Sequence, residues 1–269
     1  MKKIILIAEI GWNHMGNLNL AEKMIQASKK SGADYAKFQT WRVKNLKSGP
    51  WDKDGRREIY KKAELSEEDY LKILKMCKKY KIKFLTSIFN LKDYYLIKKL
   101  NLKTIKIPSP ENRNIQLLEF CNKKFSNIFL STGAAKISEN KKIFEIFDKK
   151  KKVNLMHCVS SYPCSDNMVN LNRINLLKKI TKNIGLSDHT PDILSSILSL
   201  DYGISVIEKH FTINNNLPGR DNKFAILPSM MEELSKNIKR FQLMKKSIKE
   251  KFSKQETEIR KVYTGRWSL

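Results

Sequence analysis

Two lysines and all four histidines of the chain lie in or just after short apolar segments, where charged side chains are rare. Lys37 and Lys106 lie inside such segments, and a buried ammonium group is costly unless an anion pairs with it. The histidines are His14, His157, His189 and His210. A single histidine in such a place is usually structural, but four in equivalent places indicate a functional site.

Hydroxyl groups accompany the two lysines. They belong to Ser87, Ser109, Ser131 and Ser187, which also follow or end apolar segments. Ammonium groups and neutral hydroxyl donors together make a site for a phosphate or a carboxylate. The pattern therefore predicts that the chain binds a small anionic molecule.

Eight apolar segments alternate with stretches of helical periodicity, which predicts parallel strands joined by helices. The predicted strands are Ile4–Ile10, Tyr35–Thr40, Lys83–Ile88, Thr104–Pro108, Ile128–Ser131, Val153–Cys158, Ile184–Ser187 and Ile204–Lys209. Eight such units predict an α/β fold, a single-domain (β/α)8 TIM barrel, in which the carboxyl ends of the strands form the active face. The absence of a GxGxxG motif after the first strand weakens the dinucleotide-binding alternative.

Three further segments complete the expected organisation. Trp41–Leu65 is a long insertion after the second strand, and we interpret it as an active-site loop. A helix near Met230–Lys246 should close the barrel, so the barrel domain is expected over 1–249. The charged and then aromatic tail, 250–269, has no evident place in it.

The formal charge of +26 comes mainly from lysines spread along the whole chain, which favours solvated helix faces over a nucleic-acid interface. Such a potential would also attract a phosphorylated substrate. No apolar run reaches ~18 residues, and the short apolar start ends at Glu9, so we expect neither a membrane span nor a signal peptide. The cysteines show no CxxC spacing, and we expect free thiols in a cytoplasmic protein: Cys77, Cys121, Cys158 and Cys164.

Motifs along residues 4 to 230 resemble the sialic acid synthase family in their order. They are Ile7–Gly11 with Asn13-His14, Gly32–Asp34 through Lys37–Thr40, Lys106–Ser109, Leu130–Gly133, His157-Cys158 with Tyr162-Pro163, Gly185–Thr190, Val206–Thr212, and Pro218-Gly219 with Asp221. The resemblance implies that phosphoenolpyruvate attacks the aldehyde of an N-acetylmannosamine-like sugar. Water then adds, phosphate leaves through C–O cleavage, and a nine-carbon α-keto acid sugar results.

The resemblance also implies roles for individual residues. His189 and His210 would bind a divalent metal, manganese or magnesium, and Glu9 would be the acid and base. The implied phosphoenolpyruvate contacts are Lys37, Ser87, Lys106, Ser109, Ser131, Ser160 and Ser187. The implied sugar contacts are Gln39, Tyr162 and Asp221. As family members form dimers, we also expect a homodimer, with no nucleic-acid or membrane partner.

Several of these residues also have structural interpretations. We expect Asp188 to hold His189 rather than touch substrate. For His157 two interpretations stay open, a hydrogen-bonded barrel residue or a site residue. His14 and Asn13 have the alternative role of shaping the first loop. Since side chains alternate along a strand, only one of Glu208 and Lys209 can face the barrel interior, and we expect Glu208.

The sequence departs from the family at two places that matter for the sugar. Many members carry a C-terminal antifreeze-like domain that lends an arginine to the partner's site, and this chain ends where that domain would begin; Arg220 is the leading replacement. Asn222 stands where many members have a histidine. Two alternatives therefore stay open: an octulosonate phosphate type synthase, with Arg56, Arg57 or Arg220 binding a sugar phosphate, and a catalytically weak barrel that acts as a binding partner.

Overall fold

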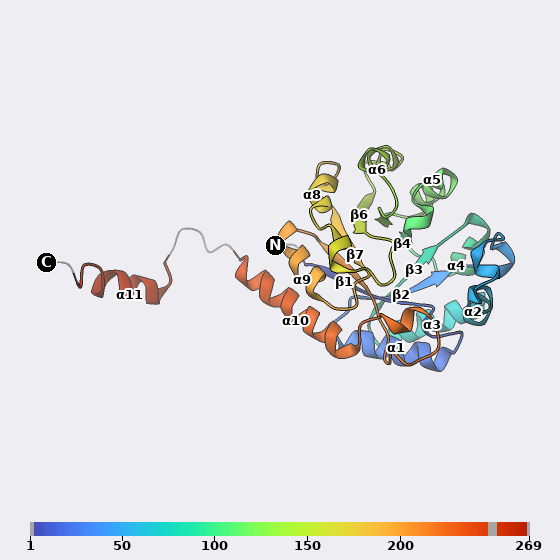
Figure 1. Cartoon of the computed structure of the whole chain (residues 1–269), viewed down its shortest axis with the longest axis horizontal. Coiled ribbons are helices and arrows are strands. Elements are labelled where there is room, and N and C mark those ends of the chain that lie inside the picture. Colours follow the sequence, from blue (N-terminus) through green and yellow to red (C-terminus); the bar gives the residue numbers. More distant parts are fainter. Residues whose placement is uncertain (1–2, 247–251, 268–269) are drawn as a thin grey trace.

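Eight parallel strands close into a barrel in the computed structural model, which describes residues 3–246 and 252–267 (Figure 1). The strands follow chain order around the barrel: β1 (Ile5–Gly11), β2 (Tyr35–Thr40), β3 (Lys83–Ile88), β4 (Thr104–Ile107), β5 (Asn127–Ser131), β6 (Lys152–Cys158), β7 (Ile184–Asp188) and β8 (Val206–His210). β1 pairs with both β2 and β8, which closes the sheet. Every strand lies within two residues of its predicted segment, so the (β/α)8 barrel prediction is confirmed.

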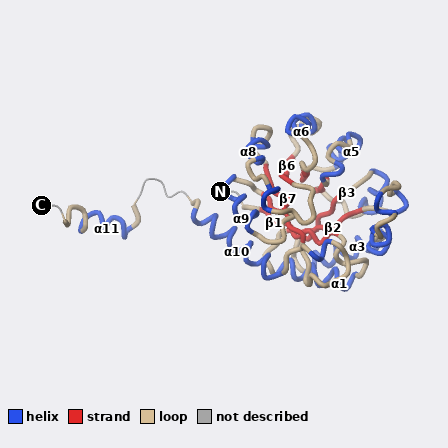
Figure 2. The backbone as a smooth tube through the Cα atoms, viewed as in Figure 1, coloured by secondary structure: helices blue, strands red, loops and turns tan. Residues whose placement is uncertain are grey.

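Helices surround the strands on the outside of the barrel (Figure 2). The helices of the barrel part of the chain are α1 (Leu18–Lys30), α2 (Arg56–Ala63), α3 (Glu67–Lys79), α4 (Tyr95–Lys98), α5 (Ile115–Lys124), α6 (Ile137–Phe144), α7 (Asp166–Val169), α8 (Arg173–Lys178), α9 (Leu194–Ser199) and α10 (Pro228–Met244), and the tail holds α11 (Lys254–Val262). Local rules explain where they begin. Ser66 caps α3 through a reciprocal capping box with Asp69, which satisfies backbone N–H groups that have no helical partner.

Side-chain alternation along the strands divides the apolar core in two. On β1, Leu6, Ala8 and Ile10 pack outward against the helices, whereas Ile7 points into the barrel. The apolar layer inside the barrel consists of Ile7, Tyr35, Leu85, Phe129, Met156 and Val206. Two residues further along β1, β2, β3, β5 and β8 the interior becomes polar, and this change marks the end of the barrel that carries the candidate site.

The tail helix α11 lies apart from the barrel in Figure 1, and none of its residues is buried. The predicted boundary between 249 and 250 falls outside the described residues, so the division into barrel and tail stays a prediction. Within the described parts of the chain, no helix has the length and apolar character needed to cross a membrane. All four cysteines are buried free thiols, as expected.

Candidate active site

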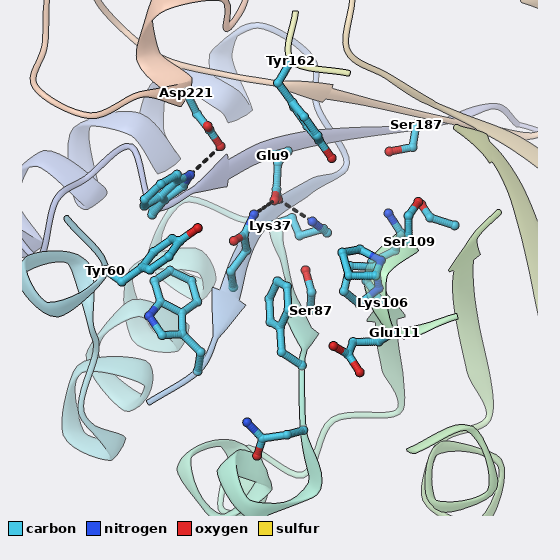
Figure 3. Close-up of a pocket in the computed structure, with 18 of the residues that line it drawn as sticks. Glu9, Lys37, Tyr60, Ser87, Lys106, Ser109, Glu111, Tyr162, Ser187 and Asp221 are labelled. Atoms are coloured by element: carbon cyan, nitrogen blue, oxygen red, sulfur yellow. Dashed lines mark hydrogen bonds and ion pairs between the residues drawn. The ribbon is translucent and has the colours of Figure 1, made fainter. Parts of the chain in front are cut away.

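The carboxyl ends of the strands surround a cavity of about 730 Å³. Its walls include twelve of the thirteen residues predicted for the site: Glu9, Lys37, Gln39, Ser87, Lys106, Ser109, Ser131, Tyr162, Ser187, His189, His210 and Asp221. Figure 3 shows the labelled members of this set pointing toward a common space. Glu9, Lys37, Lys106, His189 and His210 therefore meet at one end of the barrel, as their positions at strand ends predicted, whereas the roles of all twelve residues stay predictions.

Ser160 is the one predicted site residue that does not line the cavity. It is exposed on the β6–α7 loop, beside Gly133. A side chain at 133 would collide with the hydroxyls of Ser160 and Ser109, and the Gly133 N–H donates to Ser109 Oγ at 3.1 Å. The structure therefore gives Ser160 a place in the packing around Gly133, and Ser109 faces the cavity instead.

Four buried ionisable side chains form a cluster at the floor of the cavity, which we call the ionic cluster: Glu9, Lys37, Lys106 and Glu208. Lys37 Nζ lies 2.6 Å from Glu9 Oε2 and 3.6 Å from Glu208 Oε2, and Lys106 Nζ lies 2.7 Å from Glu208 Oε1. Each of the four side chains is at most 6% exposed. The anions that the two buried lysines were expected to need are thus supplied by the protein itself, because the carboxylates of Glu9 and Glu208 balance them.

The two carboxylates of the ionic cluster have different proton affinities. Burial raises the pKa of Glu9 to about 7, although Lys37 opposes the shift. Burial would also raise the pKa of Glu208, but Lys106 and Lys37 outweigh it and hold that pKa below its ordinary value. Gln39 Nε2 donates to Glu9 Oε1 at 2.7 Å and so orients the carboxyl group. Glu9 can thus gain or lose a proton near neutral pH, whereas Glu208 stays ionised.

Two imidazoles stand beside the ionic cluster, with ring centroids 5.3 Å apart. His189 follows β7 and His210 ends β8, and these strands are neighbours, as predicted. Burial lowers the pKa of His189 to about 4 and also lowers that of His210, so both rings are neutral. His189 Nδ1 lies 2.7 Å from the Val159 carbonyl oxygen, so the proton is on Nδ1 and the lone pair on Nε2.

Asp188 does not hold His189, contrary to our expectation. It pairs with Lys209 at 3.1 Å and accepts hydrogen bonds from the hydroxyls of Ser195 and Ser196 at 2.6 Å. The reason is alternation along β7, which points Asp188 toward α9 while its neighbour points into the cavity. By the same rule Glu208 faces the interior and Lys209 the helices, as predicted.

The two remaining histidines do not line the cavity. His157 Nε2 lies 2.7 Å from the Val169 carbonyl oxygen, which places this histidine in a structural hydrogen bond. His14 Nδ1 accepts from the N–H of Gly16, and Asn13 donates to the Phe211 carbonyl oxygen. These two residues shape the loop after β1, so the structural interpretations apply to all three side chains.

An aromatic wall that the sequence argument did not identify lines one side of the cavity. It consists of Trp12, Trp41, Tyr60 and Phe89. Trp12 stacks on Tyr60 at 4.8 Å between centroids and donates its indole N–H to Asp221. Trp41 meets both Tyr60 and Phe89 edge to face. Trp41 and Tyr60 belong to the predicted insertion, which lines the cavity as expected and includes α2.

Glu208 and Cys158 also line the cavity, although neither was among the predicted site residues. Cys158 Sγ accepts from Ser109 Oγ at 3.3 Å, and burial raises the pKa of its thiol, which disfavours the reactive thiolate form. Alternation along β8 had predicted that Glu208 faces the barrel interior, but the sequence argument gave it no role in the site.

The arginines at the outer rim of the cavity differ in whether a carboxylate already pairs with them. Arg56 pairs with Asp54 at 2.6 Å, and Arg57 pairs with Asp52. Arg220 is exposed and lines the cavity next to Asp221, and the described residues give its side chain no hydrogen bond or ion pair. Of the three arginines considered for a sugar phosphate, Arg220 is thus the one available to a ligand.

Comparison with known sequences identifies relatives along most of the chain. Residues 24–250 match the profile of the NeuB family. The N,N'-diacetyllegionaminic acid synthase of Campylobacter jejuni is 36% identical over 258 residues, which cover 90% of this chain and 77% of that protein. The pseudaminic acid synthase of the same species is 34% identical over 239 residues, covering 84% and 70% of the two chains.

Solved structures agree with the sequence comparison. The N-acetylneuraminic acid synthetase of Leptospira borgpetersenii superposes with a TM-score of 0.87 at 30% identity, covering 97% of this chain and 91% of that one. A DAHP synthase of Thermotoga maritima superposes with a TM-score of 0.70 at 14% identity, covering 90% and 69% of the chains, a likeness of fold alone.

Proposed function

The chain belongs to the NeuB family, and on that premise we propose that it condenses phosphoenolpyruvate with an N-acetylmannosamine-like aldose to give a nine-carbon α-keto acid. The enol carbon of phosphoenolpyruvate forms a bond to the aldehyde carbon. Water adds to the resulting cation, and the C–O bond to phosphate breaks, which releases inorganic phosphate. The relatives support this assignment because they are named as synthases of legionaminic, pseudaminic and neuraminic acids.

The observation that carries the proposal is the pair of buried lysines surrounded by cavity-lining hydroxyls. Lys37 and Lys106 would bracket the anionic groups of phosphoenolpyruvate, and Ser87, Ser109 and Ser131 would donate to its oxygens. The hydroxyl of Ser131 is buried without a hydrogen-bond partner, so a ligand oxygen would satisfy it. Ser187 would be a fourth donor.

Glu9 is the group we propose to move protons. Its pKa of about 7 lets it hold a proton for the developing alkoxide and accept one from water. Gln39 keeps one carboxyl oxygen oriented, and Lys37 contacts the other. Glu9 also lies on the strand beside His210, so it is close to the proposed aldehyde position.

We further propose that His189 and His210 bind a divalent metal ion, Mn²⁺ or Mg²⁺. Both rings are neutral, the form that metals bind, and the tautomer of His189 leaves Nε2 free as a ligand. Across 3–246 and 252–267, no three His, Cys, Asp or Glu side chains are grouped to hold a metal. The protein would thus supply two ligands, and the bound ion would polarise the aldehyde oxygen.

The outer part of the cavity would hold the sugar. Tyr162, Gln39 and Asp221 would contact its polar groups, and the aromatic wall offers a surface for its apolar face. Arg220 would give the charge complementarity that the family's C-terminal domain brings elsewhere. A phosphorylated sugar is the weaker alternative because two of the three candidate arginines, Arg56 and Arg57, already have carboxylate partners. The proposal also includes a cytoplasmic homodimer.

A phosphate-release assay tests the proposal directly. Phosphoenolpyruvate and MnCl₂ are supplied with N-acetylmannosamine, its 6-phosphate, diacetamido-trideoxy aldoses and arabinose 5-phosphate, and the acid product is identified by mass spectrometry. We expect phosphate release to require a free N-acylated aldose. Release with arabinose 5-phosphate would favour the octulosonate type, and no release with any aldose would contradict the proposed function.

A further inference from the structure

One carboxylate inside the barrel already occupies the groups expected to bind the substrate anion. Glu208 Oε1 accepts from Lys106 Nζ at 2.7 Å and from Ser187 Oγ at 2.9 Å, and Glu208 Oε2 lies 3.6 Å from Lys37 Nζ. All three partners line the cavity. We propose that Glu208 is an internal substitute for the substrate anion, which phosphoenolpyruvate must displace from Lys106 and Ser187 when it binds. This inference rests on the proposed function.

The geometry favours displacement over simple addition. Lys106 and Glu208 are each about 3–6% exposed at the side chain, so no bulk water separates the pair. A substrate phosphate or carboxylate that accepts hydrogen bonds from Lys106 and Ser187 must therefore lie close to the Glu208 carboxylate. Like charges at such a distance repel strongly where solvent is excluded.

The charge of the ionic cluster leads to the same conclusion. Two ammonium groups face two carboxyl groups, so the lysines bring no excess positive charge for an incoming anion once both carboxyls are ionised. Glu208 lies 2.7 Å from Lys106 Nζ and 3.6 Å from Lys37 Nζ, so its carboxylate is the anion that both ammonium groups already contact. The cluster thus leaves neither buried lysine without a counter-ion, and this pairing lowers the affinity for phosphoenolpyruvate.

The proposal predicts the sign of a charge-removal experiment. If Glu208 competes with the substrate anion, Glu208→Gln should bind phosphoenolpyruvate more tightly. If Glu208 only orients the two lysines for the substrate, the same variant should bind it more weakly. Glu208→Asp keeps the charge and is the matched control, and it should not share the gain.

Isothermal titration calorimetry of phosphoenolpyruvate in metal-free buffer measures these affinities without catalysis. We expect the Kd of Glu208→Gln to fall at least tenfold, about 1.4 kcal/mol. Inorganic phosphate, titrated as a second probe, should also bind Glu208→Gln more tightly than the wild type. An equal or weaker affinity of Glu208→Gln for phosphoenolpyruvate would overturn the inference while leaving the proposed function standing.

A second pair of proteins keeps the test decisive if Glu208→Gln does not fold. Lys106→Met combined with Glu208→Gln removes one cation and one anion together, a change that buried ion pairs often tolerate. This double variant should bind phosphoenolpyruvate more tightly than Lys106→Met alone, and the reverse order would overturn the inference. If the wild type itself neither binds phosphoenolpyruvate nor releases phosphate with any aldose, the proposed function fails and the inference fails with it.

Discussion

The barrel interior has two layers that share the same strands and differ in what they contribute. The lower layer is apolar, with Phe129 and Leu85 among its members, and the layer above it holds the ionic cluster. On β1, β2 and β8 the apolar residue and the charged residue are two positions apart on the same face of the strand. The pairs are Ile7 and Glu9, Tyr35 and Lys37, and Val206 and Glu208. A shift of two residues along a strand therefore changes the role of a side chain from packing to chemistry.

The difference also decides how each layer responds to substitution. In the apolar layer every side chain contributes on its own through packing, so the loss of one leaves a cavity. In the ionic cluster each charge depends on its partner, so the loss of Lys106 leaves Glu208 without its nearest counter-ion. Removing one partner of a buried pair costs about 3–5 kcal/mol. Substitution of a single lysine should therefore harm both folding and binding.

The largest expected effect falls on catalysis, at the rim of the upper layer. His189→Ala should abolish metal-dependent phosphate release, because one of the two proposed metal ligands is lost. Lewis-acid stabilisation is worth several kcal/mol, which is on the order of a thousandfold in rate. Phosphate release and bound manganese would be measured on the same sample.

His157→Gln is the matched control for that substitution. His157 is a buried histidine at the end of β6, but it contacts the Val169 carbonyl oxygen and does not line the cavity. The variant should keep its manganese and most of its activity. Equal losses in both variants would show that histidine removal acts through the fold and not through the proposed site.

The next effect concerns the lower layer and should be seen in stability. Phe129→Ala removes a fully buried ring from the barrel interior and should cost about 3–5 kcal/mol of unfolding free energy. Activity per folded molecule should stay close to that of the wild type, because Phe129 does not line the cavity. Urea unfolding and the phosphate-release assay measure the two quantities. A large loss of activity in fully folded protein would refute the separation of the layers.

The strands and the convergence of the site were predictable because both depend on local rules. Apolar runs of strand length, separated by helical periodicity, identify eight βα units, and in such a barrel the ends of all strands meet. Lys37 and Lys106 were recognised because charges inside apolar runs are exceptional. Asp221 follows no strand end directly, so it was named only through the family resemblance.

The partners of those residues were not predictable from spacing. Lys106 and Glu208 are 102 positions apart, and Trp12 and Asp221 are 209 apart, so only barrel closure and strand register bring them together. The error at Asp188 was different in kind. Adjacent strand residues point to opposite faces, and this rule, applied to Glu208 and Lys209, also separates Asp188 from His189.

The smallest of the three effects is a pH dependence of the unfolding free energy, which arises from Glu9 in the ionic cluster. Glu9 lies one alternation above Ile7, and burial raises its pKa from the ordinary value of 4.5 to about 7. A carboxyl whose pKa is raised on folding contributes stability below about pH 4.5, and that contribution is lost as the pH rises through 7. Relative to Glu9→Gln, which cannot ionise, the wild type should therefore lose roughly 3 kcal/mol of unfolding free energy between pH 4.5 and pH 8. Urea unfolding of both proteins at several pH values measures this difference. Glu9→Gln should also lack the ionisation near pH 7 in the pH profile of phosphate release. Parallel stability curves for the two proteins would mean that Glu9 is ionised throughout, in which case the Lys37 contact dominates over burial.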